Sequence, residues 1–281
     1  MKKKIALVLE GGGLRGAYTA GTMAWLNEHN IEVASAYGIS TGAWHLCCFL
    51  HNNPSLEKEL SIKYISDKKY MGLGAFFKGE GVFSFKSLLK DLTEKTAFNL
   101  DSIRNTSVNA NIGLYNLKEG KTLYYNVKDI NMDHMIAACS LPLLSKVVKI
   151  GNDEFLDGGI TKMIPIEKAV EDGNDAFIVV TTKPGSFVRK PSNKFVVWLM
   201  KLVYHKYKSI GEDYSVRDKN YYDQLNLIKK LENQGRAIYR FPSKPSNVTR
   251  LKGSPEELEE LYNLGYSDME AIKDKIFDLC K

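Results

Sequence analysis

Two glycine-rich junctions near the start of the chain constrain its fold more than any other feature of the sequence. Ile5–Leu9 is a continuous apolar run, typical of a strand covered on both faces, and "GGGLRG" follows it before apolar residues recur at helical spacing up to His29. A second strand is predicted at Val33–Tyr37, and "GISTG" leads from it into an apolar helix over Ala43–Leu50. Strand, loop, helix, strand, turn and helix in this order predict an α/β fold with a parallel sheet.

The later segments continue this alternation as far as residue 182 and become mostly helical beyond Pro184. Residues 52–105 are predicted to be mostly helical, with a loop at "MGLGAFFKGEGVFSF". After them we expect a β-hairpin, a helix closed by Pro142, a strand ending in "EFLDGGI", a helix at Ile166–Glu171 and a strand at "AFIVVTT". Near the end, Ser254 is expected to cap a helix that begins at Pro255.

Composition and charge exclude several classes of protein. With 281 residues, 44% of them hydrophobic and 26% charged, the chain can bury a large core, and disorder of the whole chain is excluded. The net charge of +6 is spread along the chain, so it permits contact with an anionic surface without predicting a nucleic-acid partner. Four cysteines without metal or disulfide spacing, and no apolar run near the ~20 residues that span a bilayer, predict a cytoplasmic protein with reduced thiols and no metal.

The glycines of the first junction allow two interpretations. Gly11, Gly13 and Gly16 satisfy the G-x-G-x-x-G pattern of dinucleotide-binding folds. That pattern also requires an acidic residue after the second strand to bind the ribose, whereas Glu32 precedes the predicted strand. A nucleotide site is therefore the weaker of the two interpretations.

The second junction favours nucleophilic catalysis. "GISTG" is a G-x-S-x-G between a strand and a helix, where Gly38 and Gly42 would permit the tight turn that exposes the hydroxyl of Ser40. Attack on an ester creates an oxyanion, which preorganised N–H groups must stabilise. The amides of Gly11–Gly13, at the end of the neighbouring parallel strand, are suited to this role, and Arg15 would add positive charge beside them.

A serine nucleophile also requires a base. Each of the five histidines reads more simply as a surface or packed residue, and His205, the one that follows far downstream, lies on a lysine-rich helix face. Asp157 is the better candidate because it ends an apolar strand and precedes Gly158 and Gly159, which let backbone approach closely. Partial burial would raise the pKa of this carboxyl and improve its match to a serine proton, although Asp-Gly-Gly is also a common turn.

Taken in order, "GGGLRG", "GISTG" and "DGG" resemble the motifs of the patatin-like phospholipases, and residues 5–182 are similar to the bacterial branch of that family. The resemblance implies a three-layer α/β/α fold with a mainly parallel central sheet, a catalytic domain at residues 1–182 and a mostly helical extension at 183–281, packed on that domain or covering its site. It further implies a Ser–Asp dyad of Ser40 and Asp157, with Gly11–Gly13 as the oxyanion hole and no cofactor. Thr41 stands where members commonly have alanine, which bears on the shape of the acyl pocket.

The function expected from the resemblance is lipid acyl hydrolysis of the phospholipase A or esterase type, through an acyl-enzyme on Ser40. The expected partner is a lipid or acyl-ester substrate. The alternative is a catalytically silent lipid-binding or regulatory protein of the same fold. Headgroup, acyl length and oligomeric state are not specified by these motifs.

One further segment has two interpretations. "KFVVWLMKLVYHKYK" places Lys194, Lys201, His205 and Lys208 on one face of a helix and leaves a wide aromatic and apolar face. That face would pack against the core, or it would form a lid or a weak peripheral contact with the inner membrane surface.

Overall fold

The computed structural model describes residues 3–65, 67–70, 84–96 and 98–281. Most of the predicted glycine-rich loop, "MGLGAFFKGEGVFSF", lies outside these ranges. The central element is a sheet of eight strands in the order β5-β6-β3-β2-β1-β7-β8, with β4 paired to β3. The strands are β1 (Ile5–Leu9), β2 (Ser35–Ile39), β3 (Asn109–Asn116), β4 (Lys121–Asn126), β5 (Val148–Ile150), β6 (Asp153–Asp157), β7 (Ala176–Val180) and β8 (Ala237–Arg240).

The sheet is mainly parallel, as the sequence predicted. β1 pairs in parallel with β2 and β7, β2 with β3, and β7 with β8. The hairpin partner β4 and the pair β5–β6 are antiparallel additions at the β3 side. β1 is buried along its whole length, which explains why its residues are apolar without alternation.

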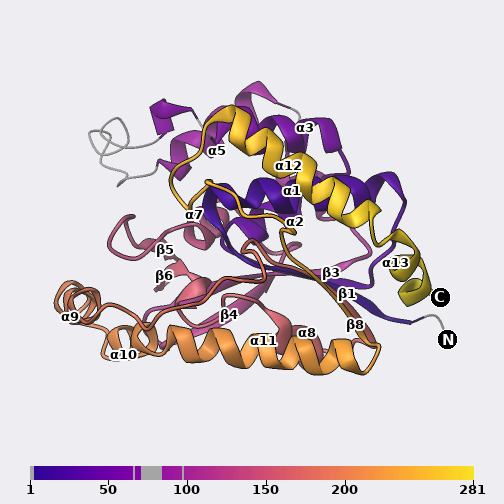
Figure 1. The fold of residues 1–281 in the computed structure, drawn as a ribbon. Helices are drawn as coiled ribbons and strands as arrows, with labels where there is room; N and C mark the ends of the chain where they lie inside the picture. Colours follow the sequence, from indigo (N-terminus) through magenta and orange to yellow (C-terminus); the bar gives the residue numbers. More distant parts are fainter. Residues whose placement is uncertain (1–2, 66, 71–83, 97) are drawn as a thin grey trace.

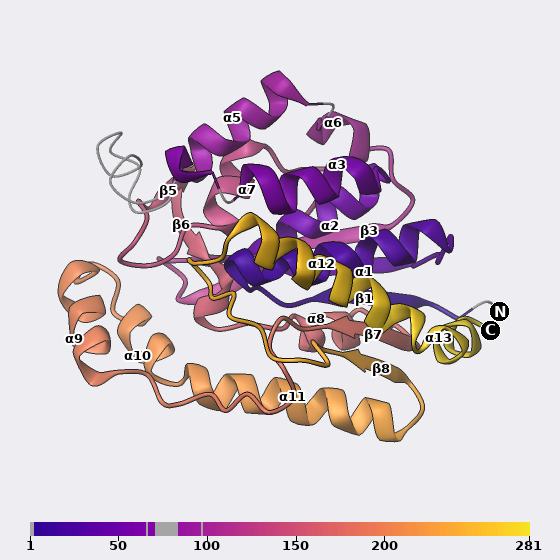
Figure 2. The same cartoon turned by 45° about the horizontal axis from the view of Figure 1, so that its top comes forward.

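Helices cover both faces of the sheet, so the fold is a three-layer α/β/α sandwich (Figures 1 and 2). Leu7 and Leu9 of β1 point into a core shared with one helical layer, while Ala6 and Val8 point into the core beneath the other. The first layer comprises α1 (Gly16–Glu28), α2 (Thr41–His51), α3 (Pro54–Glu59), α5 (Phe85–Lys95), α6 (Leu100–Ile103), α7 (Met132–Ala138), α12 (Pro255–Glu270) and α13 (Lys273–Cys280). The second comprises α8 (Ile166–Glu171) and α11 (Arg217–Asn233).

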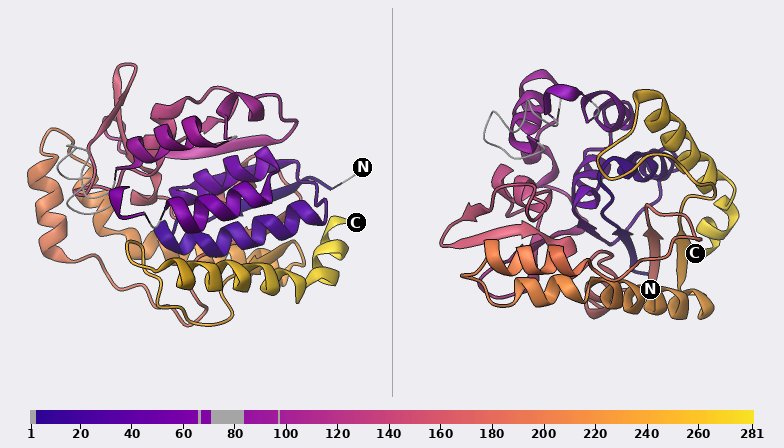
Figure 3. Two further views of the ribbon diagram at one scale, coloured as in Figure 1. Left: turned by 90° about the horizontal axis from the view of Figure 1, so that it is seen from above. Right: turned by 60° about the vertical axis from the view of Figure 1, so that its left-hand side comes forward.

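Two more helices, α9 (Lys194–Val203) and α10 (Ile210–Ser215), pack around Tyr115 and Leu156, near the end of the sheet where β5 and β6 lie (Figure 3). Short helical turns lie at Gly13–Arg15, Leu60–Tyr64, Lys68–Tyr70 and Gly158–Ile160. No disulfide joins the four cysteines, all of which the structure describes.

The C-terminal region is helical, as predicted, and Ser254 caps α12 in a capping box with Glu257. Two details differ from the sequence-based expectations. α9 ends at Val203 rather than continuing to Lys208. The region also contributes β8, a strand of four residues that extends the parallel sheet beside β7. A strand this short carries too little period-two pattern to be found in the sequence.

Among the helices that the structure describes, none combines the length and apolar character needed to cross a bilayer.

Candidate active site

A cavity of about 300 Å³ opens at the edge of the sheet where β1 and β2 have their carboxyl ends. Its walls include the loop after β1, the turn after β2, the segment from Cys139 to Ser145 and the end of β6. Val196 and Met200 of α9 and several residues beyond Pro184 complete it. Ligands of open α/β sheets bind at this edge, outside the carboxyl ends of the strands.

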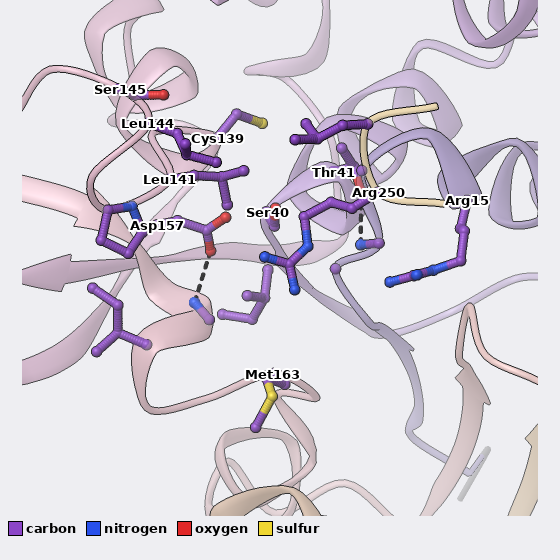
Figure 4. A pocket seen from close by; sticks show the side chains of 18 of the residues that line it. Arg15, Ser40, Thr41, Cys139, Leu141, Leu144, Ser145, Asp157, Met163 and Arg250 are labelled. Atoms are coloured by element: carbon purple, nitrogen blue, oxygen red, sulfur yellow. Dashed lines mark hydrogen bonds between the residues drawn. The ribbon is translucent and has the colours of Figure 1, made fainter. Parts of the chain in front are cut away.

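Ser40 lies at a sharp turn between β2 and α2. Its φ of +57° falls in the left-handed region, which a non-glycine residue occupies only where the surrounding structure enforces it. The two flanking glycines allow this turn: a Cβ on Gly38 would come within 2.5 Å of the Gly42 carbonyl oxygen, and one on Gly42 within 2.6 Å of the Leu9 carbonyl oxygen. Ser40 therefore projects into the cavity from the start of α2 (Figure 4).

The sheet register explains why Asp157 lies beside Ser40. Along one edge of β3, Ile39 of β2 pairs with Gly113, while Asp157 of β6 pairs with Leu114, the next residue of β3. The opposite edge of β3 is occupied by β4. β2 and β6 thus run toward each other along the same edge of β3, and each must leave the sheet where they meet. Ser40 is the first residue after β2 and Asp157 is the last residue of β6, so the two lie where these strands end.

The carboxyl group of Asp157 is buried and points toward Ser40 in the cavity (Figure 4). Burial raises its pKa above the usual range, as expected from the sequence. The Ser40 hydroxyl, the amide of Gly159, Arg217 and Arg250 oppose this effect, because each stabilises the ionised form. The Gly159 amide donates to Oδ1 at 2.7 Å. Gly158 packs closely on the Gly113 carbonyl, where a Cβ would come within 2.5 Å.

The glycine loop after β1 runs beside Ser40. A Cβ on Gly11 would come within 2.6 Å of the Cβ of Ser40, so only glycine fits at this position. Gly13 has a φ of +58°, and Gly16, the first residue of α1, packs against the ring of His45. The amide of Gly12 donates a hydrogen bond to Oγ1 of Thr41 at 3.0 Å (Figure 4). One predicted oxyanion donor is therefore engaged by the residue that departs from the family pattern.

A buried ion pair fixes the base of this loop. The side chain of Glu10 is fully buried, forms an ion pair with Lys183 and accepts hydrogen bonds from the amide and hydroxyl of Thr182. Burial raises the pKa of Glu10, but the pairing with Lys183, the Thr182 hydrogen bond and the charge of Arg15 together outweigh burial and hold the pKa below its usual value. This ion pair was not predicted from the sequence. Its signal was weak: Lys183 follows a buried strand that ends at the same edge as the glycines.

The cavity is strongly basic. Among the described residues, five cationic side chains line it, against the two carboxylates of Glu10 and Asp157; the five are Arg15, Lys183, Arg189, Arg217 and Arg250. From the sequence, positive charge at the site was predicted only at Arg15. Of the three arginines beyond Pro184, Arg189 and Arg250 lie in loops and Arg217 begins α11. No sequence motif at these positions distinguishes an arginine of the site from one on the surface.

The histidines lie elsewhere. The structure describes all five, and none lines the cavity. His45 is buried behind the turn with its Nδ1 at 3.4 Å from Oε1 of Glu57, and burial lowers its pKa to about 3. Burial raises the pKa of Glu57, so the charged form is disfavoured for both groups. Among the described residues, no group of three His, Cys, Asp or Glu side chains is arranged to bind a metal.

Comparison with known proteins relates the chain to others of similar sequence. A family model described as patatin-like phospholipase matches residues 7–170, and one described as a domain of unknown function (DUF6363) matches residues 207–281. The uncharacterized protein YjjU of Escherichia coli (strain K12) is 23% identical over 280 residues, covering 93% of this chain and 75% of that protein. The probable lipid hydrolase 463L of invertebrate iridescent virus 6 is 25% identical over 203 residues, covering 63% of this chain and 69% of that protein.

Among solved structures, VipD from Legionella pneumophila aligns with 98% of this chain and 67% of its own, at 14% identity and a TM-score of 0.48.

Proposed function

This chain belongs to the patatin-like phospholipase family, and from that membership we propose that it is a lipid hydrolase that cleaves carboxylic esters through an acyl-enzyme on Ser40. The similarity to a probable lipid hydrolase of a virus supports lipid hydrolysis in general. The observation that carries the finer proposal is the meeting of β2 and β6 on one edge of β3, which brings the Ser40 hydroxyl and the Asp157 carboxyl into one cavity.

In the proposed first step, the oxygen of Ser40 attacks the ester carbonyl while Asp157 accepts the hydroxyl proton. A carboxylate with a raised pKa is a stronger base than an exposed aspartate, which suits it to this transfer. The proton on Asp157 then passes to the leaving alcohol as the ester bond breaks, and the acyl group remains on Ser40.

The developing oxyanion would be stabilised by amides of the loop Gly11–Gly13, which runs beside Ser40. Loss of one such donor typically costs ~3–4 kcal/mol of transition-state stabilisation. In the second step Asp157 accepts a proton from water, the resulting hydroxide attacks the acyl-enzyme, and the proton returns to Ser40 as the acid leaves.

Labelling with a fluorophosphonate tests the assignment of Ser40. The wild type should be labelled covalently, Ser40→Ala should not, and ester hydrolysis by Ser40→Ala should fall by about a thousandfold or more. Asp157→Asn should remain folded and be labelled much more slowly, because the base is lost. Ser55→Ala, which removes an exposed hydroxyl of α3, serves as the control. Equal labelling of wild type and Ser40→Ala would refute the proposal.

The alternative, a catalytically silent lipid-binding protein, is favoured by one observation. The Gly12 amide is already engaged by Thr41, so an oxyanion would have to compete for it. The same experiment separates the two functions, since a silent protein would bind lipid but resist labelling.

We also propose a peripheral contact between α9 and the membrane surface. Phe195, Trp198, Leu202 and Val203 are exposed, at 65%, 55%, 55% and 51%, while Val196 and Met200 of the same helix line the cavity. α9 is therefore apolar both on its solvent-facing side and on its protein-facing side. Such a helix is suited to bind a membrane surface, from which lipid would enter the site. This arrangement is compatible with a cytoplasmic protein at the inner membrane surface.

The division at residue 182 remains our proposal for the organisation of the chain. In it, residues 1–182 carry Ser40 and Asp157, and residues 183–281 pack on them and complete the cavity with Arg189, Arg217 and Arg250.

A further inference from the structure

Three arginines from separate parts of the C-terminal region converge on the cavity. Arg189 lies in the loop after β7, Arg217 is the first residue of α11, and Arg250 lies in the loop before α12. In Figure 4 the side chain of Arg250 extends toward Ser40 and Asp157, with Arg15 on the other side of the glycine loop. Arg217 also contacts the turn that follows Asp157, because its Nε donates to the Gly159 carbonyl at 2.9 Å.

Within the described part of the chain, these three guanidinium groups form no direct ion pair, although the charge of Asp157 lies near Arg217 and Arg250. No carboxylate of the described residues lies within ion-pair distance of Arg189, Arg217 or Arg250, and the Glu10 carboxylate pairs with Lys183. Arg189 stacks on the ring of Tyr221, with its CZ atom 4.6 Å from the ring centre, and its Nε is buried without a hydrogen-bond partner. The Nε of Arg15 is likewise buried and unpaired.

Like charges held this way raise the free energy of the empty site. Burial lowers the pKa of Arg189 and of Arg217, and repulsion from Arg250 lowers both further. The negative charges of Glu10 near Arg189 and of Asp157 near Arg217 offset this lowering only in part. Arginine nevertheless remains protonated at neutral pH. An anion with several oxygens would relieve this repulsion and satisfy the unpaired N–H groups through charge-assisted hydrogen bonds.

We propose that Arg189, Arg217 and Arg250 form a subsite for the phosphate group of the ester substrate, and that the preferred substrates are acyl lipids whose phosphate is a monoester. This inference rests on the proposed function and specifies its substrate class. A phosphate monoester carries up to two negative charges, which the arginines would attract. In a zwitterionic headgroup, the cationic amine would be repelled by those arginines that do not bind the phosphate. An additional alcohol on the phosphate would remove one of its negative charges and cover one of the oxygens available to the guanidinium groups.

Kinetics with short-chain, water-soluble lipids test the substrate class. We would compare kcat/KM for dihexanoyl phosphatidic acid, dihexanoyl phosphatidylcholine and dihexanoylglycerol in the wild type, Arg189→Gln and Arg250→Gln. Lys229→Gln, which removes one positive charge from the exposed side of α11, is the matched control. The wild type should prefer phosphatidic acid at least tenfold, each arginine variant should lose most of this preference, and the control should keep it.

Equal kcat/KM for the three lipids in the wild type, or an undiminished preference in both arginine variants, would overturn the subsite. Thermal unfolding of each variant checks that it is folded. The two substitutions lie in different loops. If one variant fails to fold, the other variant still tests the proposal.

Calorimetric binding to Ser40→Ala separates this inference from the proposed function. Dihexanoyl phosphatidic acid should bind, and an added Arg250→Gln change should weaken binding about tenfold or more. If the wild type hydrolyses none of the esters but this arginine-dependent binding is present, the hydrolase proposal fails and the subsite stands. If inorganic phosphate binds as tightly as the lipid, the ligand is free phosphate, and the inference about the substrate is wrong.

Discussion

The carboxyl group of Asp157 is buried where β6 leaves the sheet, and its pKa determines the pH range in which it can accept a proton. Burial raises that pKa, and Arg217 and Arg250 lower it through their positive charge. Activity should therefore fall on the acidic side as Asp157 becomes protonated. Because removal of a cation destabilises the carboxylate, Arg250→Gln should shift this acidic limb to higher pH.

The measurement is kcat/KM against pH for a neutral ester, in wild type, Arg250→Gln and Lys229→Gln. The control should follow the wild-type profile. An acidic limb that stays in place or moves to lower pH in Arg250→Gln would contradict the proposed influence of this arginine on Asp157.

Thr41, which stands where family members commonly have alanine, bears on the number of amides that are available to the oxyanion. Its hydroxyl oxygen accepts a hydrogen bond from the Gly12 amide, so removal of this acceptor should leave the amide available to the oxyanion. Since a hydrogen bond of this kind contributes about 0.5–1.5 kcal/mol, Thr41→Val should accelerate fluorophosphonate labelling by up to about tenfold. Thr41→Ser keeps the hydroxyl and should behave like the wild type. Slower labelling of Thr41→Val would mean that the hydroxyl instead holds the loop in its active arrangement.

At the scale of the element, α9 has the most unusual exposure. A vesicle-binding helix should lose affinity when its large exposed side chains become polar, because each contributes ~1.5–3 kcal/mol when buried. Trp198→Gln is expected to reduce flotation with anionic vesicles by about tenfold. Phe277→Gln, on α13 at the opposite end of the molecule (Figure 1), removes another exposed aromatic ring and should have no effect.

The exposed lysines of the same segment, Lys194, Lys201, Lys206 and Lys208, should make this binding stronger on anionic than on neutral lipid. Flotation that is equal for wild type and Trp198→Gln, or independent of lipid charge, would remove the membrane proposal. It would leave the proposed chemistry at Ser40 unaffected.

On the scale of the whole molecule, the two ends of the chain pack together. α12 lies along α1 (Figure 2), and their backbones touch at Gly21 and Gly265: a Cβ on Gly265 would overlap the Tyr18 carbonyl. Tyr18 also donates to Asp268 at 2.9 Å. Residues from both parts of the chain therefore share one hydrophobic core.

We expect Gly265→Ala to lower the free energy of unfolding by about 1–3 kcal/mol through overpacking, although alanine favours helix. Asn263→Ala, on the exposed side of α12, should change it by less than about 0.5 kcal/mol. Urea unfolding followed by fluorescence and circular dichroism should show one transition for the whole chain. Two separate transitions would show that residues 183–281 fold independently.

Features that depend on residues close together in the chain could be predicted from the sequence. The apolar strand Ile5–Leu9, the glycine loop after it and the turn around Ser40 all follow from local patterns, since backbone conformation and burial leave a periodic or glycine-rich signal. Asp157 was predicted to be the base from its position at the end of an apolar strand before two glycines, and the family resemblance supported this prediction. The α/β class followed from the order of these segments.

Which distant residues share the cavity could be seen only in the folded protein. The convergence of β2 and β6 on β3, the ion pair of Glu10 with Lys183 and the approach of Arg189, Arg217 and Arg250 each join segments far apart in the chain. An arginine in a loop has the same local pattern whether it faces solvent or an active site. Its role depends on the path of the chain around it, which packing of the complete core determines.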